Sequence, residues 1–139
     1  MDINECLEKR YLIKIKPAND LIEKEFNEAR YDLEKAERAF ENEDYKWGII
    51  KSYYCIFHSA RAVLFKLGYR EKRHFAIGII LEDLNKKGKL EIKYINYFNA
   101  AISSREDADY HYVYSKETAE YNLEIAREFL EKMLELVRK

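Results

Sequence analysis

Residues 44–68 decide the fold, and they read DYKWGIIKSYYCIFHSARAVLFKLG. Asp44 is a favourable N-cap residue, and Gly68 is a typical residue just beyond a helix C-terminus. Between these two ends, apolar side chains occupy almost the whole circumference of the expected helix, so other helices must cover most of it. Gly48 costs stability inside a helix, and we expect a neighbouring helix to approach its backbone closely. The stretch predicts a long central helix.

A second long helix is predicted before it, in residues 20–41. Asp20 and Glu23 resemble a capping box, with Asp in place of Ser or Thr. Behind them, apolar residues repeat with steps of three and four, which places them on one face of a helix. This apolar stripe consists of Ile22, Phe26, Ala29, Leu33, Ala36 and Phe40.

Three further helical patterns follow the central helix. They cover residues 74–85, residues 90–105 and the chain after Ser115, which is a good N-cap. Residues 106–114 form the connection before the last helix.

The composition supports a helical protein. Only four glycines and one proline interrupt a chain that is 47% hydrophobic and 37% charged, which favours long helices. No segment alternates like a strand, and residues 2–16 form a lead-in to the first long helix. We therefore expect an all-α, antiparallel up-and-down bundle of four main helices plus a short helix, forming a single domain over residues 1–139.

Charge and cysteine content limit the function. The net charge of −1 argues against general attraction to nucleic acid, so contact with RNA requires a local basic patch. Cys6 and Cys55 lack the spacing of metal ligands, and we expect reduced thiols. No apolar run reaches the roughly 20 residues of a membrane span, and the acidic N-terminus lacks the pattern of a signal peptide. We therefore expect a cytoplasmic protein without membrane contact.

Chemistry is indicated at the end of the fourth helical pattern, where residues 104–111 read SREDADYH. Arg105 can hold phosphate oxygens bidentately, and a histidine such as His111 can take or give a proton near neutrality. A guanidinium beside an imidazole can therefore act on a phosphodiester without a metal. The structural alternative is that Arg105 complements the helix dipole and pairs with Glu106 or Asp109, while His111 packs against Tyr110 or Tyr112.

A second candidate surface lies on the central helix. Four side chains follow one another at steps of three and four, hence on one face: Lys51, Tyr54, His58 and Arg61. Unpaired charge is expensive to bury, so this line requires an explanation. Three explanations remain open: the face is exposed to solvent, it lines a polar subunit interface, or it borders a cleft for an anionic ligand.

No metal site or cofactor is expected. Asp107 and Asp109 lack the further ligands that a divalent ion needs. His58, His74 and His111 do not share a helix turn, so a zinc site would have to be assembled by tertiary folding.

Several of these segments together are similar to the HEPN superfamily, above all to its small stand-alone branch. The combination is more specific than any one piece, and it covers the chain from about Leu12 to the C-terminus. The similar segments are residues 33–36 (LEKA), 52–64 (SYYCIFHSARAVL), 105–110 (REDADY) and 126–130 (AREFL), with His74 opening the third helix.

The resemblance implies a homodimer in which two copies of an Arg-x(4–6)-His motif share a cleft, here Arg105 and His111. It also implies a metal-independent RNase, in which the ribose 2′-hydroxyl attacks its own phosphate and leaves a 2′,3′-cyclic end. Arg105 would then stabilise the charged phosphorane, and His111 would act as general base or acid. We predict that the substrate or dimer cleft is lined by Lys51, Tyr54, His58, Arg61, Asp109 and Tyr110.

The resemblance also implies partners. Such proteins are often toxins paired with a nucleotidyltransferase antitoxin, and some antitoxins adenylylate a tyrosine two residues after the histidine. Val113 stands at that position here, between Tyr112 and Tyr114. Because this branch often lacks the histidine, the alternative is a non-catalytic HEPN module that binds a nucleotide, RNA or a nucleotidyltransferase. A ligand-free structural or oligomerisation unit is the third possibility.

Overall fold

The central helix forms as predicted. In the computed structural model, which describes residues 1–138, it is α3, Tyr45–Leu67. The Asp44 carboxylate accepts a hydrogen bond from the Trp47 amide (3.4 Å), and Gly68 ends the helix in the left-handed region with a φ of 88°. Both predicted ends of this helix are therefore confirmed.

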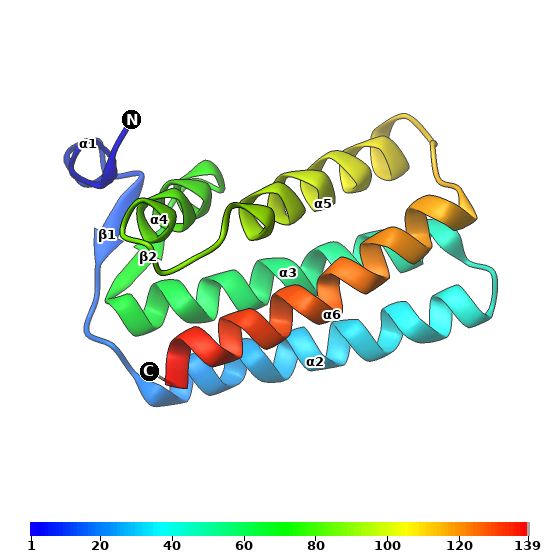
Figure 1. The fold of residues 1–139 in the computed structure, drawn as a ribbon, viewed down its shortest axis with the longest axis horizontal. Helices are drawn as coiled ribbons and strands as arrows, with labels where there is room; N and C mark the ends of the chain where they lie inside the picture. The colour runs from blue at the N-terminus through cyan, green and yellow to red at the C-terminus, as the bar shows by residue number, and fades with distance from the viewer. Residues whose placement is uncertain (139) are drawn as a thin grey trace.

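The helix α3 occupies the middle of a bundle. It packs against α2 (Asn19–Glu41), α5 (Ile92–Tyr110) and α6 (Lys116–Arg138), and these long helices alternate in direction along the chain, as Figure 1 shows. The shorter α4 (Phe75–Lys86) packs near the C-terminal end of α3. The predicted all-α bundle of four main helices and a shorter one is confirmed.

The N-terminal lead-in forms a short helix, α1 (Ile3–Glu8), and then a strand, β1 (Leu12–Lys14). This strand pairs antiparallel with β2 (Tyr69–Glu71), with Leu12 opposite Glu71. The sequence gives no sign of these strands, because strands of three residues are too short to show the alternation that identifies a strand in a sequence. The small sheet ties the lead-in to the connection between α3 and α4.

The start of α2 differs from its prediction. Asn19 is the first helical residue and Ala18 is the N-cap, and no side chain caps the helix. The capping box predicted from Asp20 and Glu23 is therefore wrong. Asp20 instead lies in the first turn, where a carboxylate complements the helix dipole. The apolar stripe is confirmed, with Ile22, Phe26, Ala29 and Ala36 buried and with Leu33 and Phe40 partly buried.

The end of α5 lies five residues beyond its predicted end at Arg105. Ala108 is fully buried in a small apolar cluster with Ile49 of α3 and Ala119 of α6. This tertiary packing keeps the segment helical. The predicted connection over residues 106–114 is therefore wrong in its first half.

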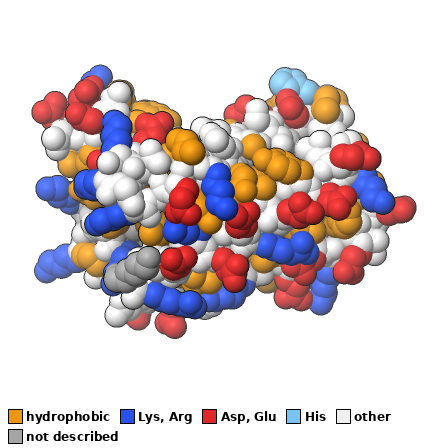
Figure 2. Space-filling view, viewed as in Figure 1, with side chains coloured by type: hydrophobic (Ala, Val, Ile, Leu, Met, Phe, Trp, Pro, Cys, Tyr) orange, Lys and Arg blue, Asp and Glu red, His pale blue; other side chains and the backbone are white. Residues whose placement is uncertain are grey.

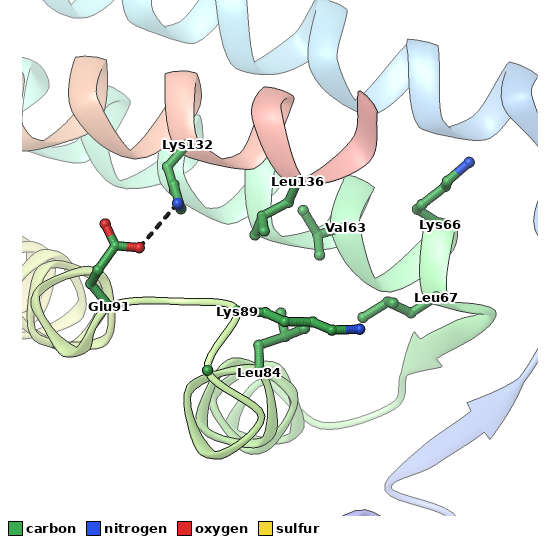
Figure 3. A pocket seen from close by; sticks show the side chains of 9 residues that line it. Val63, Lys66, Leu67, Leu84, Lys89, Glu91, Lys132 and Leu136 are labelled. Carbon is green, nitrogen blue, oxygen red and sulfur yellow. Dashed lines mark ion pairs between the residues drawn. The ribbon is translucent and has the colours of Figure 1, made fainter. Parts of the chain in front are cut away.

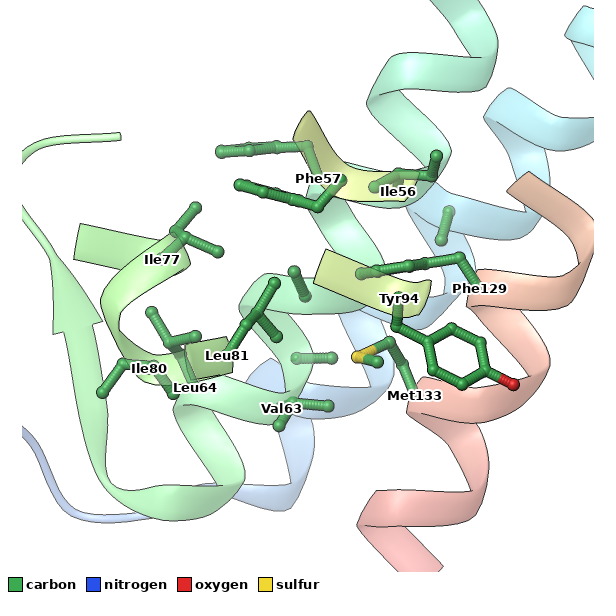
Figure 4. Packing of buried hydrophobic residues seen from close by; sticks show 14 of the residues in the cluster. Ile56, Phe57, Val63, Leu64, Ile77, Ile80, Leu81, Tyr94, Phe129 and Met133 are labelled. Carbon is green, nitrogen blue, oxygen red and sulfur yellow. The ribbon is translucent and has the colours of Figure 1, made fainter. Parts of the chain in front are cut away.

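The last helix, α6, begins as predicted and closes the core. The Ser115 hydroxyl accepts a hydrogen bond from the Thr118 amide (3.1 Å), which caps the helix. Further along, Phe129 and Met133 are fully buried among apolar side chains of α3, α4 and α5 (Figure 4). This core fixes the orientation of α3 and α5, which carry the predicted site residues.

The surface mixes both signs of charge. On the face shown in Figure 2, Lys and Arg side chains alternate with Asp and Glu instead of gathering by sign. Cys6 and Cys55 are both buried and form no disulfide. Within residues 1–138, no helix combines the length and the apolar character that a bilayer crossing requires.

Candidate functional site

Arg105 lies near the C-terminal end of α5 and faces α3. Its guanidinium carbon is 5.2 Å from the centroid of the Tyr53 ring and 5.9 Å from that of the Tyr54 ring, which are cation–π contacts. Its Nε atom is 3.5 Å from the Asp109 carboxylate and has no hydrogen-bond partner within residues 1–138. The two rings and one carboxylate hold the guanidinium, while 25% of the side chain stays exposed.

His111 stands just after α5, as its C-cap residue. Its Nδ1 atom is 3.2 Å from the Asp107 carboxylate, and 67% of the side chain is exposed. Arg105 and Asp109 are four residues apart and share one face of α5. Asp107 and His111 are also four residues apart, but each lies two positions after a member of the first pair, so this second pair is on a different face. The structure thus brings the two predicted catalytic residues to one end of α5, where each contacts a different carboxylate.

His74 shares the face of Arg105, although no spacing in the sequence indicates this. The Tyr53 hydroxyl is 3.1 Å from Nδ1 of His74, and the His74 ring stacks on Phe57 with a centroid separation of 4.9 Å. Burial raises the pKa of Tyr53 to about 12, against the opposing charge of Arg105, so the hydroxyl keeps its proton at neutral pH. Tyr53 therefore contacts Arg105 with its ring and His74 with its hydroxyl.

The chain has relatives among known proteins. Residues 22–137, most of the chain, match the family model of the HEPN domain. The chain belongs to the HEPN family. It is also similar to "Putative toxin MJ0142" from Methanocaldococcus jannaschii, with 29% identity over 90 residues. That match covers 64% of this chain and 61% of the relative, so the chain spans less than two thirds of the relative's length.

In this HEPN protein, the predicted line of polar side chains on α3 contacts α2. His58 places Nδ1 2.6 Å from Glu25 and Nε2 3.7 Å from Asp32. Lys51 is 3.6 Å from Asp32. The two helices run antiparallel, so a step forward on α2 corresponds to a step backward on α3. Glu25 contacts His58, and seven residues further along α2 Asp32 contacts Lys51, which lies seven residues before His58 on α3.

Arg61, the next cation on this line, also binds carboxylates. Its guanidinium is 2.5 Å from Glu71 of β2 and 3.5 Å from Glu25. The guanidinium carbon lies 4.6 Å from the centroid of the Phe57 ring. Lys51, His58 and Arg61 thus all contact carboxylates of the same chain. Ion pairing inside one subunit was not among the three explanations open for this face, and it accounts for the partial burial of the cations.

Side chains that could ligate a metal meet in the same network. Glu28, Asp32 and His58 each offer a ligand atom, and these atoms lie within 4.8 Å of one another. Glu25 and Lys51 already contact two of the three residues. Burial raises the pKa of Asp32, although Lys51 and His58 act to lower it. We therefore interpret the cluster as an ion-pair network that joins α2 to α3.

A cavity of about 530 Å³ opens between α3, α4 and α6 (Figure 3). Val63, Leu84 and Leu136 supply part of its apolar lining, and Lys132 points toward Glu91 at a distance of 3.0 Å. None of the predicted site residues lines this cavity. It is therefore separate from the face that carries Arg105 and His74.

Proposed function

We propose that this HEPN protein is a metal-independent endoribonuclease that acts as a homodimer. The observation that carries the proposal is the setting of Arg105, a partly exposed guanidinium held over two tyrosine rings with one carboxylate at 3.5 Å. The guanidinium has five N–H donors, and within residues 1–138 its ion pair is with Asp109. The planar guanidinium matches phosphate oxygens in geometry and stays charged at every pH at which RNA is stable.

In the proposed reaction, the ribose 2′-oxygen attacks the adjacent phosphorus. The P–O2′ bond forms as the P–O5′ bond breaks, which leaves a 2′,3′-cyclic phosphate and a 5′-hydroxyl. Arg105 stabilises the negative charge that develops on the phosphoryl oxygens. His111 accepts the proton of the 2′-hydroxyl or delivers a proton to the departing 5′-oxygen.

The catalytic pair is proposed to form between subunits. In one chain Arg105 contacts Asp109 and His111 contacts Asp107, so the two side chains have separate partners. A two-fold axis beside this end of α5 would let one subunit provide Arg105 and the other provide His111. The 67% exposure of the His111 side chain supports this arrangement, because the ring is accessible to a second chain.

Cleavage of RNA in EDTA tests the proposal. Wild-type protein should produce 2′,3′-cyclic ends, and Arg105→Ala and His111→Ala should each slow cleavage by roughly two orders of magnitude or more. Arg127→Ala is the matched control, because it removes an exposed arginine of α6 that pairs with Glu37. Equal cleavage by the wild type and by both site variants would exclude the assignment.

A mixture of two inactive variants tests the pairing between subunits. In a dimer of one Arg105→Ala chain and one His111→Ala chain, one of the two composite sites regains both side chains. Statistical exchange of subunits should therefore restore about a quarter of the wild-type activity. If both residues act within one chain, no site regains both, and the mixture stays inactive.

We further propose that the protein is a toxin whose antitoxin is a nucleotidyltransferase. The name of the Methanocaldococcus jannaschii relative supports the toxin assignment. Val113 has no hydroxyl to modify, but Tyr112 and Tyr114 beside it are 75% and 45% exposed. A nucleotidyltransferase encoded next to this gene should, with ATP, add one adenylyl group to the peptide that contains these tyrosines. An unchanged peptide mass, with the toxin still silenced, would point to control by binding alone.

The second candidate function is binding without cleavage. The separation of Arg105 from His111 within the chain favours it, because a binding module needs Arg105 but not the histidine. The protein would then bind a nucleotide, RNA or a nucleotidyltransferase through the face that contains Arg105. RNA that survives incubation with wild-type protein, together with Arg105-dependent binding, would support this function.

A further inference from the structure

Four basic side chains around α3 differ in how many carboxylates they contact. His58 and Arg61 each contact two carboxylates within 3.7 Å. Arg105 contacts one, at 3.5 Å, and His74 forms no ion pair within residues 1–138. Of these four residues, Arg105 and His74 therefore offer an incoming anion the least competition.

Tyr53 connects these two residues. The Arg105 guanidinium carbon lies 5.2 Å from the centroid of its ring, and its hydroxyl is 3.1 Å from Nδ1 of His74. Tyr53 is 2% exposed, so the packing of α3 fixes its position. Arg105 and His74 are thereby held on one face of the chain by contacts with the same side chain.

The contact with Tyr53 occupies Nδ1 of His74, so Nε2 is the ring nitrogen left for another partner. Tyr53 keeps its proton, since burial raises its pKa to about 12. When the phenol donates to Nδ1, the neutral imidazole has its hydrogen on Nε2. When the imidazole is protonated, both nitrogens have hydrogens. In both of these states Nε2–H is a donor directed away from Tyr53.

Packing alone does not explain His74. It occupies the N-cap position of α4, yet its side chain makes no capping hydrogen bond. One face of its ring stacks on Phe57, and the residue is nevertheless exposed. An exposed histidine whose ring is held by Tyr53 and Phe57 is suited to binding an acceptor through Nε2 when that nitrogen has its hydrogen.

We propose that His74 binds the same RNA strand as Arg105, with Nε2–H donating to a phosphate oxygen and with Tyr53 as the residue that positions it. This assignment rests on the proposed action on RNA, and it gives the Arg105 site a second contact from the same chain. One subunit then holds the strand at two points, while the partner subunit supplies His111.

Binding of an RNA that cannot be cut tests this role. The probe is a fluorescent single-stranded 2′-O-methyl oligoribonucleotide, which has phosphodiesters but no 2′-hydroxyl to attack. Its affinity is measured by anisotropy in EDTA at one fixed, low salt concentration, because phosphate contacts weaken with salt. We expect Arg105→Ala and His74→Ala each to weaken binding by about tenfold or more, as the loss of a charge-assisted hydrogen bond does.

Three more variants test whether the effect of His74→Ala comes from the lost contact between His74 and RNA. Tyr53→Phe keeps the ring under Arg105 and removes only the hydroxyl, so it should weaken binding by about threefold. His74→Gln retains an N–H donor of similar reach and should bind within about threefold of wild type. Arg127→Ala on α6 should leave affinity unchanged. A thermal melt of each variant verifies that it is folded.

The possible outcomes separate the role of His74 from the nuclease proposal. Arg105-dependent binding that is insensitive to His74→Ala overturns the role of His74 and leaves the nuclease proposal standing. Binding that needs His74, by a protein that leaves natural RNA intact, supports that role and removes the nuclease. Failure of the wild type to bind the probe overturns both.

Discussion

The two sides of α3 use the same kinds of side chain differently. On the side that faces α2, each cation meets carboxylates of its own chain, as the His58–Glu25 contact of 2.6 Å shows. On the side that faces α4 and α5, Arg105 and His74 rest against aromatic rings and have one carboxylate between them. A basic side chain that is paired with carboxylates therefore belongs to a structural surface, whereas one that is largely unpaired can accept an anion.

The strongest change should follow the loss of Arg105, on the side of α3 that faces α5, and it should be a fall in RNA cleavage. Arg105→Ala should reduce RNA cleavage by about 100-fold. It should lower the free energy of unfolding by less than about 1 kcal/mol, because Arg105 makes a single ion pair at a partly exposed position. Cleavage assays and thermal melts of the same preparation check both numbers. If the fall in cleavage were explained by a fall in the fraction of folded protein, Arg105 would be a structural residue instead.

Arg61→Ala should lower the stability of the protein and leave RNA cleavage nearly unchanged, which is the reverse of the effect expected for Arg105→Ala. Glu71, whose side chain is 4% exposed, would lose its nearest cation. Because Arg61 is itself 23% exposed and water can enter the gap, we expect a loss of about 2–3 kcal/mol, below the full cost of breaking a buried pair. Urea denaturation measures this loss, while cleavage per folded molecule should stay within about threefold. Adding Glu71→Gln should recover part of the stability, and a midpoint unchanged by Arg61→Ala would contradict the structural role.

The sequence predicts the fold well where local signals and packing agree. The ends of α3 follow from Asp44 and Gly68, because an N-cap carboxylate and a left-handed glycine act through the backbone nearby. The end of α5 does not follow from such signals, since Ala108 is held helical by packing against α3 and α6. The two short strands depend on the approach of segments far apart in the chain.

The candidate site is only partly predictable for the same reason. Helical spacing correctly places Lys51, His58 and Arg61 on one line, but it does not reveal which helix supplies their carboxylates. The step from Glu25 to Asp32 is seven residues, as is the step from Lys51 to His58. For two antiparallel helices this match predicts that the carboxylates of one helix face the basic side chains of the other. No comparable signal exists for the contact between Tyr53 and His74, which are 21 residues apart and lie on different elements.

The carboxylate of Asp32, on the α2 side of α3, should make the stability of the protein depend on pH. Burial raises the pKa of Asp32 above its ordinary value of 3.8, against the lowering effects of Lys51 and His58. The folded protein therefore binds this proton more tightly than the unfolded chain does, so the contribution of Asp32 to stability is largest at acidic pH. It is lost as the pH rises through the raised pKa. Asp32→Asn removes this dependence, and the stability of the variant relative to wild type should increase between about pH 4 and neutrality. Parallel pH dependences of the two proteins would contradict the prediction.

The smallest expected effect comes from Gly48, on the side of α3 that faces α2 and α6. A Cβ atom there would lie 3.8 Å from the Ala36 carbonyl oxygen and 3.9 Å from Cβ of Ala119, which are ordinary contacts. The neighbouring helices therefore come near but do not require glycine, and Gly48→Ala should raise the free energy of unfolding by about 0.5–1 kcal/mol. Gly68→Ala is the contrasting variant, because its φ of 88° and a contact of 3.2 Å should make alanine destabilising. If the α2 side is purely structural, Gly48→Ala leaves RNA binding unchanged; altered affinity would mean that the two sides of α3 are coupled.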